Sequence, residues 1–214
     1  MRATSSPQYQ RQKSRCGRIT SMDRNLFEKV NRFADRTAWL HGPMRLYAKY
    51  GIGLFAALLL VAWWQARASD APIRNVSGAV WAGVSALLAI AINQPIGSAV
   101  GRARPYDTLS NVHILLDRTK DFSFPSDHAT VAGAVAAGLL LANRKLGIAA
   151  LLAAILMAFA RVYAGAHYPG DVLAGLLLGA TIAIALSALA RKLITPGLKR
   201  LSDTPFRLLV AREQ

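Results

Sequence analysis

Five long apolar segments constrain the fold more than any other feature of the sequence. Each is close to the roughly 20 residues that an α-helix needs to cross a lipid bilayer. They lie at about residues 45–65, 76–98, 126–142, 147–166 and 171–190. Glycine and alanine are frequent inside them, as in "GAVAAGLLLA", and such small residues let membrane helices approach one another closely. The sequence therefore predicts an all-α, polytopic membrane helical bundle of about five transmembrane helices.

The charge distribution favours a membrane protein over a soluble nucleic-acid-binding domain. The 214 residues are 53% hydrophobic and carry a formal net charge of +15. Of the 26 Lys and Arg residues, 11 precede residue 50 and six follow residue 190, so the middle of the chain holds few charges. A nucleic-acid-binding domain would instead spread its basic residues over a soluble face. We expect a multi-pass protein of the cell membrane with no nucleic-acid partner.

The two ends of the chain differ from the apolar middle. Residues 1–22 are rich in Ser, Arg and Gln and are expected to form a disordered basic tail, in which Cys16 is a bystander. Residues 23–43 place apolar side chains at helical spacing between Arg and Lys, which predicts an amphipathic helix. This helix would lie in the membrane interface or pack on the protein itself. Residues 44–194 would form the transmembrane domain, and residues 195–214 a basic C-terminal tail.

Alternate crossing of the membrane would bring the unusual polar residues to one side. The end of the second segment, the start of the third, and the junction of the fourth and fifth would then share one surface. The stretches "GRARPYD", "FPSDHAT" and "ARVYAGAHYPGDVLAG" occupy these places. Ionisable groups at membrane depth are costly and usually functional. The candidate site residues are Arg104, Ser126, Asp127, His128, Arg161, His167 and Asp171.

The residue types in these stretches suit the transfer of a phosphate group. Arginine guanidinium groups bind phosphate oxygens in a bidentate manner. Pro125 fits the first position of a helix, which would place Ser126 and the free amides of that turn against an anion. Two histidines can divide the work, since one can attack phosphorus while the other protonates the leaving oxygen. An aspartate beside the nucleophilic imidazole would fix its tautomer. We expect Asp171 in the first turn of the fifth segment and His167 in the preceding loop.

A zinc site built from His128, His167 and Asp171 is the main alternative chemistry. The sequence has no Cys pair and no His-x3-His spacing that would support it. The two nearby arginines would also repel a cation. We therefore expect no metal and no cofactor.

The three polar stretches resemble the signature motifs of the type 2 phosphatidic acid phosphatase superfamily. Those motifs read Lys-x6-Arg-Pro, Pro-Ser-Gly-His and Ser-Arg-x5-His-x3-Asp. The matching residues are Arg104 and Pro105, then Pro125, Ser126 and His128, then Arg161, His167 and Asp171. The resemblance covers roughly residues 90–190 and implies a lipid phosphatase that needs no metal.

The same resemblance implies a role for each matching residue. His167 would be the nucleophile, forming a phosphohistidine, with Asp171 as its partner. His128 would be the general acid. The phosphate would be held by Arg104, Ser126 and Arg161.

Three positions depart from the family motifs. The expected lysine is Gly97, the expected glycine is Asp127, and the expected serine is Ala160. Arg102 and Lys120 are candidates to replace the missing lysine charge. Asn93, inside the second segment, is a further candidate for a contribution to the site.

Within the superfamily, the "PSDH" form, the missing lysine and the short chain most resemble bacterial undecaprenyl-diphosphate phosphatases of the bacitracin-resistance type. The expected substrate is therefore undecaprenyl diphosphate, held in the bilayer and converted to undecaprenyl phosphate. One alternative is a phosphatase for phosphatidic acid, phosphatidylglycerophosphate or a prenylphosphoryl sugar phosphate. Another is a non-enzymatic binder or transporter of anionic lipid.

The basic residues of the loops also bear on orientation. Ten Lys and Arg lie in the loops opposite the motifs and in the C-terminal tail, against five at the motif surface. Cytoplasmic loops are enriched in these residues, so together with the resemblance this count predicts an active site on the extracytoplasmic side.

Overall fold

The computed structural model describes residues 21–211, and this part of the chain is helical without any β-strand. The predicted all-α class is confirmed. The predictions for residues 1–20, including Cys16, lie outside the described residues. In chain order the elements are α2 (Ser21–Arg36), η1 (Ala38–Leu40), α3 (His41–Tyr50), α4 (Ile52–Arg67), α5 (Pro72–Val100), α6 (Pro105–Thr108), α7 (Asp127–Ala142), α8 (Arg144–Tyr163), α9 (Pro169–Ala185), α10 (Ser187–Ser202) and η2 (Pro205–Leu209).

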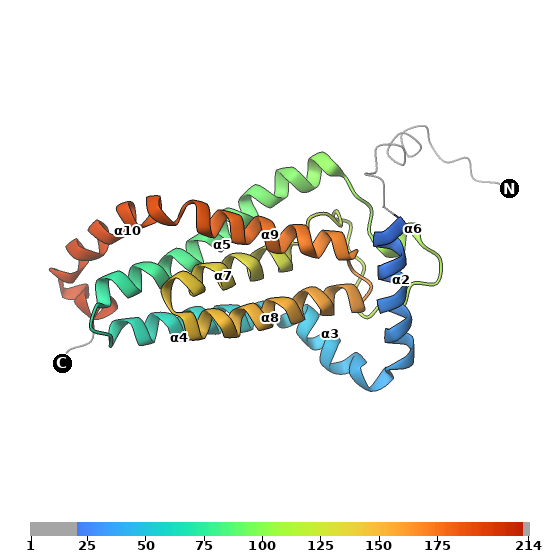
Figure 1. The fold of residues 1–214 in the computed structure, drawn as a ribbon, viewed down its shortest axis with the longest axis horizontal. Coiled ribbons are helices and arrows are strands. Elements are labelled where there is room, and N and C mark those ends of the chain that lie inside the picture. The colour runs from blue at the N-terminus through green and yellow to red at the C-terminus, as the bar shows by residue number, and fades with distance from the viewer. Residues whose placement is uncertain (1–20, 212–214) are drawn as a thin grey trace.

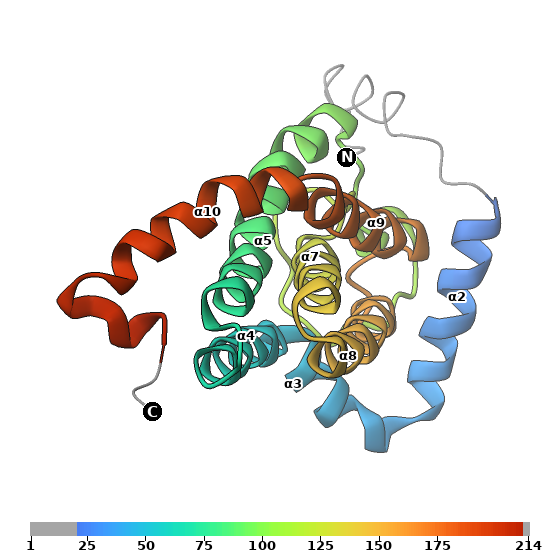
Figure 2. The same ribbon diagram turned by 60° about the vertical axis from the view of Figure 1, so that its left-hand side comes forward.

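Helix α7 forms the centre of the bundle. It runs along the long axis of the molecule, and α4, α5, α8 and α9 surround it (Figures 1 and 2). Ten of its 16 residues are buried, and most of these are Ala or Gly. Helix α2 lies across one end of the bundle, while α10 and η2 lie toward the other end (Figure 1). A polar residue at the start of α7 is therefore held in place by the helices around it.

Small residues allow α7 to approach its neighbours closely. A Cβ atom added to Gly179 of α9 would lie 2.0 Å from the Thr130 carbonyl oxygen of α7. One added to Gly138 of α7 would lie 2.7 Å from the Ala82 Cα atom of α5. Backbone cannot yield as a flexible side chain can, so both contacts require glycine. The close packing expected from the Gly- and Ala-rich segments is present.

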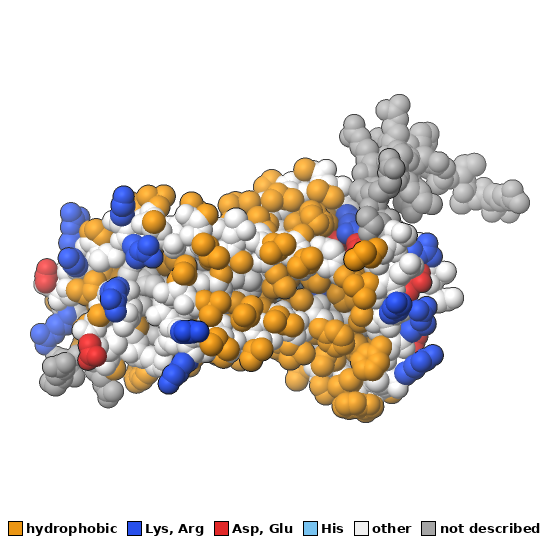
Figure 3. All heavy atoms as spheres, viewed as in Figure 1, with side chains coloured by type: hydrophobic (Ala, Val, Ile, Leu, Met, Phe, Trp, Pro, Cys, Tyr) orange, Lys and Arg blue, Asp and Glu red, His pale blue; other side chains and the backbone are white. Residues whose placement is uncertain are grey.

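The exterior of the bundle is apolar between two charged ends. Figure 3 shows hydrophobic side chains over the middle of the molecule and Lys and Arg side chains toward its two ends. By length and composition, two segments of the described residues are able to cross a membrane, Pro72–Thr108 and Arg144–Tyr163. The number rises to four if α3 with α4, and α9 with α10, each count as one bent span. Helix α7 is apolar but shorter, with 16 residues.

The first and fifth predicted segments are each broken rather than continuous. Helices α3 and α4 meet at an angle of 59° around Gly51, where an added Cβ atom would lie 2.6 Å from the Met157 side chain of α8. Helices α9 and α10 meet at 56° around Leu186. Beyond that bend α10 carries the exposed residues Arg191 and Lys192. A straight continuation into the bundle would remove water from these charged groups, which is energetically costly.

The ends of the described chain also differ from the predicted boundaries. The amphipathic helix expected over residues 23–43 ends at Arg36, and residues 38–50 form η1 and α3. Its buried side chains include Phe27 and Ala34, so this helix packs on the protein, while Leu26 and Phe33 stay partly exposed. At the other end, α10 continues to Ser202, inside the region expected to be a tail.

Candidate active site

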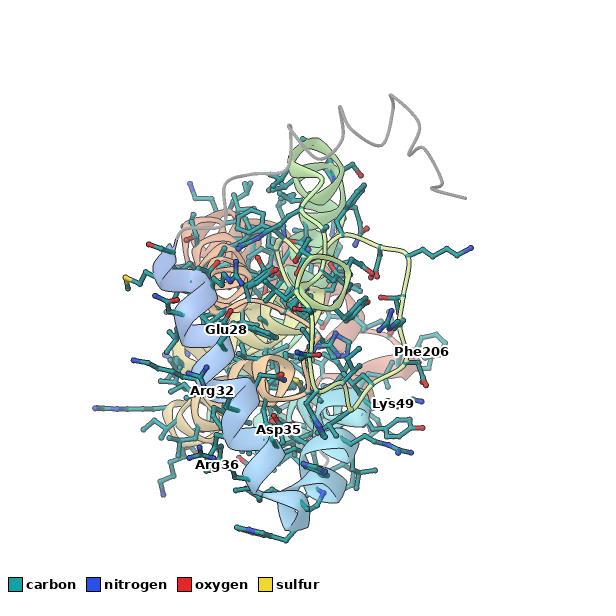
Figure 4. The ribbon with its side chains drawn as sticks, turned by 90° about the vertical axis from the view of Figure 1, so that its right-hand side faces the viewer. Glu28, Arg32, Asp35, Arg36, Lys49 and Phe206 are labelled. Atoms are coloured by element: carbon teal, nitrogen blue, oxygen red, sulfur yellow. The ribbon has the colours of Figure 1, made fainter. Side chains whose placement is uncertain are left out.

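A polar cavity of about 220 Å³ lies at the end of the bundle that α2 covers. Arg104, Asp127, His128, Arg161 and His167 all line it, so the three polar stretches do converge as alternate crossing predicts. Figure 4 views this end, with Glu28, Arg32, Asp35 and Arg36 along α2 and Lys49 extending from α3. Lys49 also lines the cavity.

The His167 imidazole has one defined tautomer. It lies in the loop between α8 and α9, and only 2% of its surface is exposed. Its Nδ1 atom is 2.7 Å from the Ser123 carbonyl oxygen, and its Nε2 atom is 3.1 Å from nitrogens of both Arg104 and Arg161. A carbonyl only accepts hydrogen bonds and a guanidinium only donates them. Nδ1 therefore carries the proton, and Nε2 presents an unprotonated lone pair toward the two arginines.

The two arginines differ in how their charges are compensated. Arg104 donates from Nε and Nη2 to the Asp121 carboxylate at 3.2 and 2.9 Å, and from Nη1 to the Ala166 carbonyl at 2.9 Å. Arg161 donates to the Ala48 carbonyl at 3.0 Å. Its buried Nε atom has no hydrogen-bond partner, and the Arg161 side chain forms no ion pair within residues 21–211. A buried cation without an acidic partner favours the binding of an anion.

Asp171 is held by a dense set of donors at the start of α9. Its side chain is fully buried, and one oxygen accepts a hydrogen bond of 2.6 Å from Arg102. The other oxygen accepts from the Ser123 hydroxyl and, at 2.9 Å, from the Tyr168 amide. This oxygen is 3.9 Å from Nδ1 of His167, so the direct partner of the imidazole is the Ser123 carbonyl. Asp171 is linked to the imidazole through Ser123, whereas we expected a direct contact. Its place in the first helical turn, with His167 in the loop, agrees with the sequence.

Arg102 connects this network to α2 and does not replace the missing lysine. Besides Asp171 it donates to Asp23, whose carboxylate also accepts a hydrogen bond of 2.8 Å from the Gly170 amide. Arg102 is buried and does not line the cavity. Lys120 is exposed and does not line it either. A guanidinium held between two carboxylates already has its counter-charges, so Arg102 is not available to phosphate in this arrangement.

The start of α7 supplies His128 and Asp127 to the cavity. The helix begins at Asp127 with Ser126 as its N-cap, so Pro125 precedes the cap. We expected Pro125 to be the first helical residue, and this expectation is wrong. The Ser126 hydroxyl makes no capping hydrogen bond. It is buried, and it has no partner among the described residues. Ser126 lies between the lining residues Pro125 and Asp127 without itself lining the cavity.

Asn93 acts on Asp127 rather than on the cavity. Its amide donates to the Asp127 carboxylate at 2.6 Å and to the Pro125 carbonyl at 3.2 Å. The neighbouring Gln94 amide donates to the same carboxylate at 3.2 Å. Asp127 is thus turned toward α5 by two amides while remaining at the edge of the cavity. The departure from the family glycine therefore has a structural partner in α5.

Sequence reasoning missed several residues of the site, among them Ser123 and Lys49. Ser123 acts through its backbone carbonyl and its hydroxyl, and a backbone contact leaves no mark in the sequence. Lys49 belongs to α3, far from every motif, and only its positive charge could have drawn attention to it. Between residues 21 and 211, no three His, Cys, Asp or Glu side chains are grouped closely enough to hold a metal ion.

Comparison with known proteins identifies the class of this protein. The family model of the PAP2 superfamily matches residues 78–194, which is more than half of the chain. The chain belongs to the PAP2 superfamily. It is a multi-pass membrane lipid phosphatase, which is a phosphoric ester hydrolase.

Individual relatives are similar over most of their length. Undecaprenyl-diphosphatase BcrC of Bacillus subtilis is 29% identical over 75% of this chain and 80% of its own. An undecaprenyl-diphosphatase of Sulfolobus acidocaldarius is 31% identical over 73% of each chain. The crystal structure of a transmembrane PAP2 type phosphatidylglycerolphosphate phosphatase from Bacillus subtilis superposes with a TM-score of 0.58, over 86% of this chain and 94% of that one, at 19% identity. That structure supports the fold alone.

The environment of His167 leads to a prediction about its protonation. Burial lowers the pKa of the imidazole well below its usual value of about 6.5, and the positive charges of Arg161 and Arg104 lower it further. Protonation therefore sets in only as the pH falls below 6.5. At pH 6.5 we expect a neutral ring with its proton on Nδ1. The 15N shifts of the ring in detergent-solubilised protein, assigned by comparison with His167→Gln, measure this. A ring half protonated at pH 6.5 would contradict the lowered pKa, and a neutral ring with its proton on Nε2 would contradict the tautomer assignment.

Proposed function

We propose that this protein hydrolyses undecaprenyl diphosphate to undecaprenyl phosphate through a phosphohistidine formed on His167. The observation that carries the mechanism is the unprotonated Nε2 atom, which lies 3.1 Å from two guanidinium groups. Phosphate oxygens bound by these guanidinium groups would place the phosphorus beside the nucleophile. The choice of lipid is supported by the relatives named undecaprenyl-diphosphatase.

In the first step Nε2 attacks the terminal phosphorus. A bond forms between Nε2 and phosphorus as the bond from phosphorus to the bridging oxygen breaks. His128, which lines the same cavity, donates a proton to that oxygen, and undecaprenyl phosphate leaves. Arg104 and Arg161 neutralise charge on the phosphate oxygens.

In the second step water releases the phosphate from His167. The His128 imidazole, left unprotonated by the first step, takes a proton from the water as its oxygen attacks phosphorus. The bond from phosphorus to Nε2 breaks, inorganic phosphate leaves, and both histidines return to their starting states. The Ser123 carbonyl keeps the proton on Nδ1 throughout, and the nearby Asp171 carboxylate favours the positive charge on the phosphorylated ring.

The buried Ser126 hydroxyl is proposed as a further phosphate ligand. It has no partner in the described part of the chain, although an unsatisfied buried hydroxyl costs about 1–3 kcal/mol. A small rotation at the start of α7 would let it donate to a phosphate oxygen. Arg104 would also exchange its Asp121 partner, which is 56% exposed, for the substrate.

The active site is proposed to face the extracytoplasmic side. In the sequence, the loops opposite the motifs and the residues after 190 contain ten Lys and Arg, against five at the motif surface. The 11 basic residues of the first 49 weigh in the other direction. The orientation therefore rests on the loops between spans, where the bias is most informative, and on the family resemblance.

His167→Ala provides the direct test of the proposed reaction. Loss of the nucleophile should lower phosphate release by about a thousandfold or more. The measurement is phosphate release from undecaprenyl diphosphate, phosphatidic acid, phosphatidylglycerophosphate and a soluble monophosphate. We expect the wild-type protein to favour undecaprenyl diphosphate. His113→Ala is the control, because His113 is a histidine that does not line the cavity. Wild-type rates from His167→Ala would refute the mechanism, and equal wild-type rates on all four substrates would refute the substrate assignment.

Two single cysteines test the orientation in a Cys16→Ser background. Ser110→Cys lies at the site end and Asp70→Cys in the loop between α4 and α5 at the other end, and both positions are exposed. In intact cells an impermeant maleimide should label Ser110→Cys but leave Asp70→Cys unlabelled until the cells are lysed. The reverse pattern would place the active site in the cytoplasm.

A further inference from the structure

The missing motif lysine leaves a question about how the site binds a highly charged substrate. Gly97 occupies the lysine position, and a Cβ atom there would lie 3.2 Å from the Phe124 carbonyl oxygen. Helix α5 therefore runs tightly against the chain that leads into α7. A long side chain at residue 97 would start from this crowded contact. Any replacement charge has to come from another element.

Lys49 is the lysine that the fold brings to the cavity. It lies near the end of α3 and lines the cavity together with Arg104, Arg161 and His167. The neighbouring residue Ala48 accepts a hydrogen bond of 3.0 Å from Arg161 through its carbonyl. The backbone that carries Lys49 is thus fixed directly to an arginine of the candidate active site.

Lys49 lies at the rim of the cavity rather than at its floor. Its side chain is 43% exposed, whereas the side chain of Arg104 is 5% exposed and that of His167 is 2% exposed. The phosphate that reacts with His167 would therefore bind deep in the cavity. A second phosphate attached to it would lie nearer the rim, within reach of a lysine.

The present partner of Lys49 is one that a substrate can replace. Its Nζ atom is 2.8 Å from the Asp117 carboxylate, whose side chain is 85% exposed. Exposed ion pairs of this kind contribute little, because water and salt screen their charges. A phosphate has more charge and more acceptor oxygens than a carboxylate, so it competes well for the ammonium group.

We propose that Lys49 binds the phosphate that stays attached to the lipid when the terminal phosphate of a lipid diphosphate is removed. Lys49 would thereby select diphosphates over monophosphates. This inference rests on the proposed function, because it takes a diphosphate as the substrate. It assigns a specificity role to α3, which lies outside the residues matched by the family model. The chemistry is the same for any lipid whose two phosphates are joined directly.

Lys49→Met tests this role, because methionine keeps much of the apolar stem and removes the charge. Loss of a charge-assisted hydrogen bond to a phosphate corresponds to an effect of about tenfold or more. We expect kcat/KM for undecaprenyl diphosphate to fall at least about tenfold more than kcat/KM for phosphatidic acid, chiefly through KM. Lys49→Arg should restore the preference. Lys120→Met, at an exposed residue outside the cavity, is the matched control.

A binding measurement separates this inference from the proposed function. Methylene diphosphonate carries two phosphorus groups that cannot be cleaved, and orthophosphate carries one. As inhibitors of soluble monophosphate hydrolysis, the diphosphonate should lose about tenfold more affinity than orthophosphate in Lys49→Met. Equal losses for both inhibitors, or no loss for either, would overturn the role of Lys49. Failure of the wild-type protein to cleave undecaprenyl diphosphate would instead overturn the proposed substrate, and the inhibitor comparison would still decide the role of Lys49.

Discussion

The compensation of one buried carboxylate organises this end of the molecule. Asp171 is fully buried, and an isolated charge in such a place would cost several kcal/mol. It is stabilised by the Arg102 guanidinium, the Ser123 hydroxyl and the Tyr168 amide. These donors come from the loop before α6, the chain before α7 and the start of α9. The need to satisfy Asp171 therefore joins segments that are far apart in the sequence.

This network also joins α2 to the active site. Arg102 reaches Asp23 as well as Asp171, and Asp23 binds the Gly170 amide at the start of α9. Helix α2 is thereby attached to the same turn that carries Asp171. Its role is structural in the first instance, because it holds in place the guanidinium that compensates the buried carboxylate. The amphipathic pattern of this helix reveals its packing face but not that attachment.

A different charge balance exists in the cavity itself. Arg161 has no acidic partner within residues 21–211, and His167 remains neutral between it and Arg104. A third positive charge at His167 would repel both guanidinium groups. Keeping the imidazole neutral therefore preserves the lone pair on Nε2 and leaves the guanidinium of Arg161, which has no acidic partner, available to an anion. The acidic groups at the rim, Asp117 and Asp121, are exposed and can be exchanged for substrate.

Much of the site could be predicted because motif spacing and alternate crossing encode it. Arg104, His128, Arg161 and His167 were placed on one surface from these two features, and they line one cavity. Contacts through the backbone were not predictable, which is why the Ser123 carbonyl was missed and a direct contact from Asp171 was expected. Arg102 was misassigned because a sequence gives the charge of a guanidinium but not its partners. The bend at Gly51 lies against the Met157 side chain of another helix, so the continuous apolar segment in the sequence did not reveal it.

The central claim is that Nε2 of His167 becomes phosphorylated during turnover. The test uses His128→Ala with a nitrophenyl phosphate as the substrate. Nitrophenolate is a good leaving group and needs no general acid, so the intermediate still forms. Its hydrolysis lacks the general base, so the intermediate should accumulate. After denaturation at alkaline pH and digestion, mass spectrometry should find a phosphate on the peptide containing His167. The same treatment of a protein that also carries His167→Ala should give none. Phosphate release without a modified His167, or modification of another residue, would contradict the account.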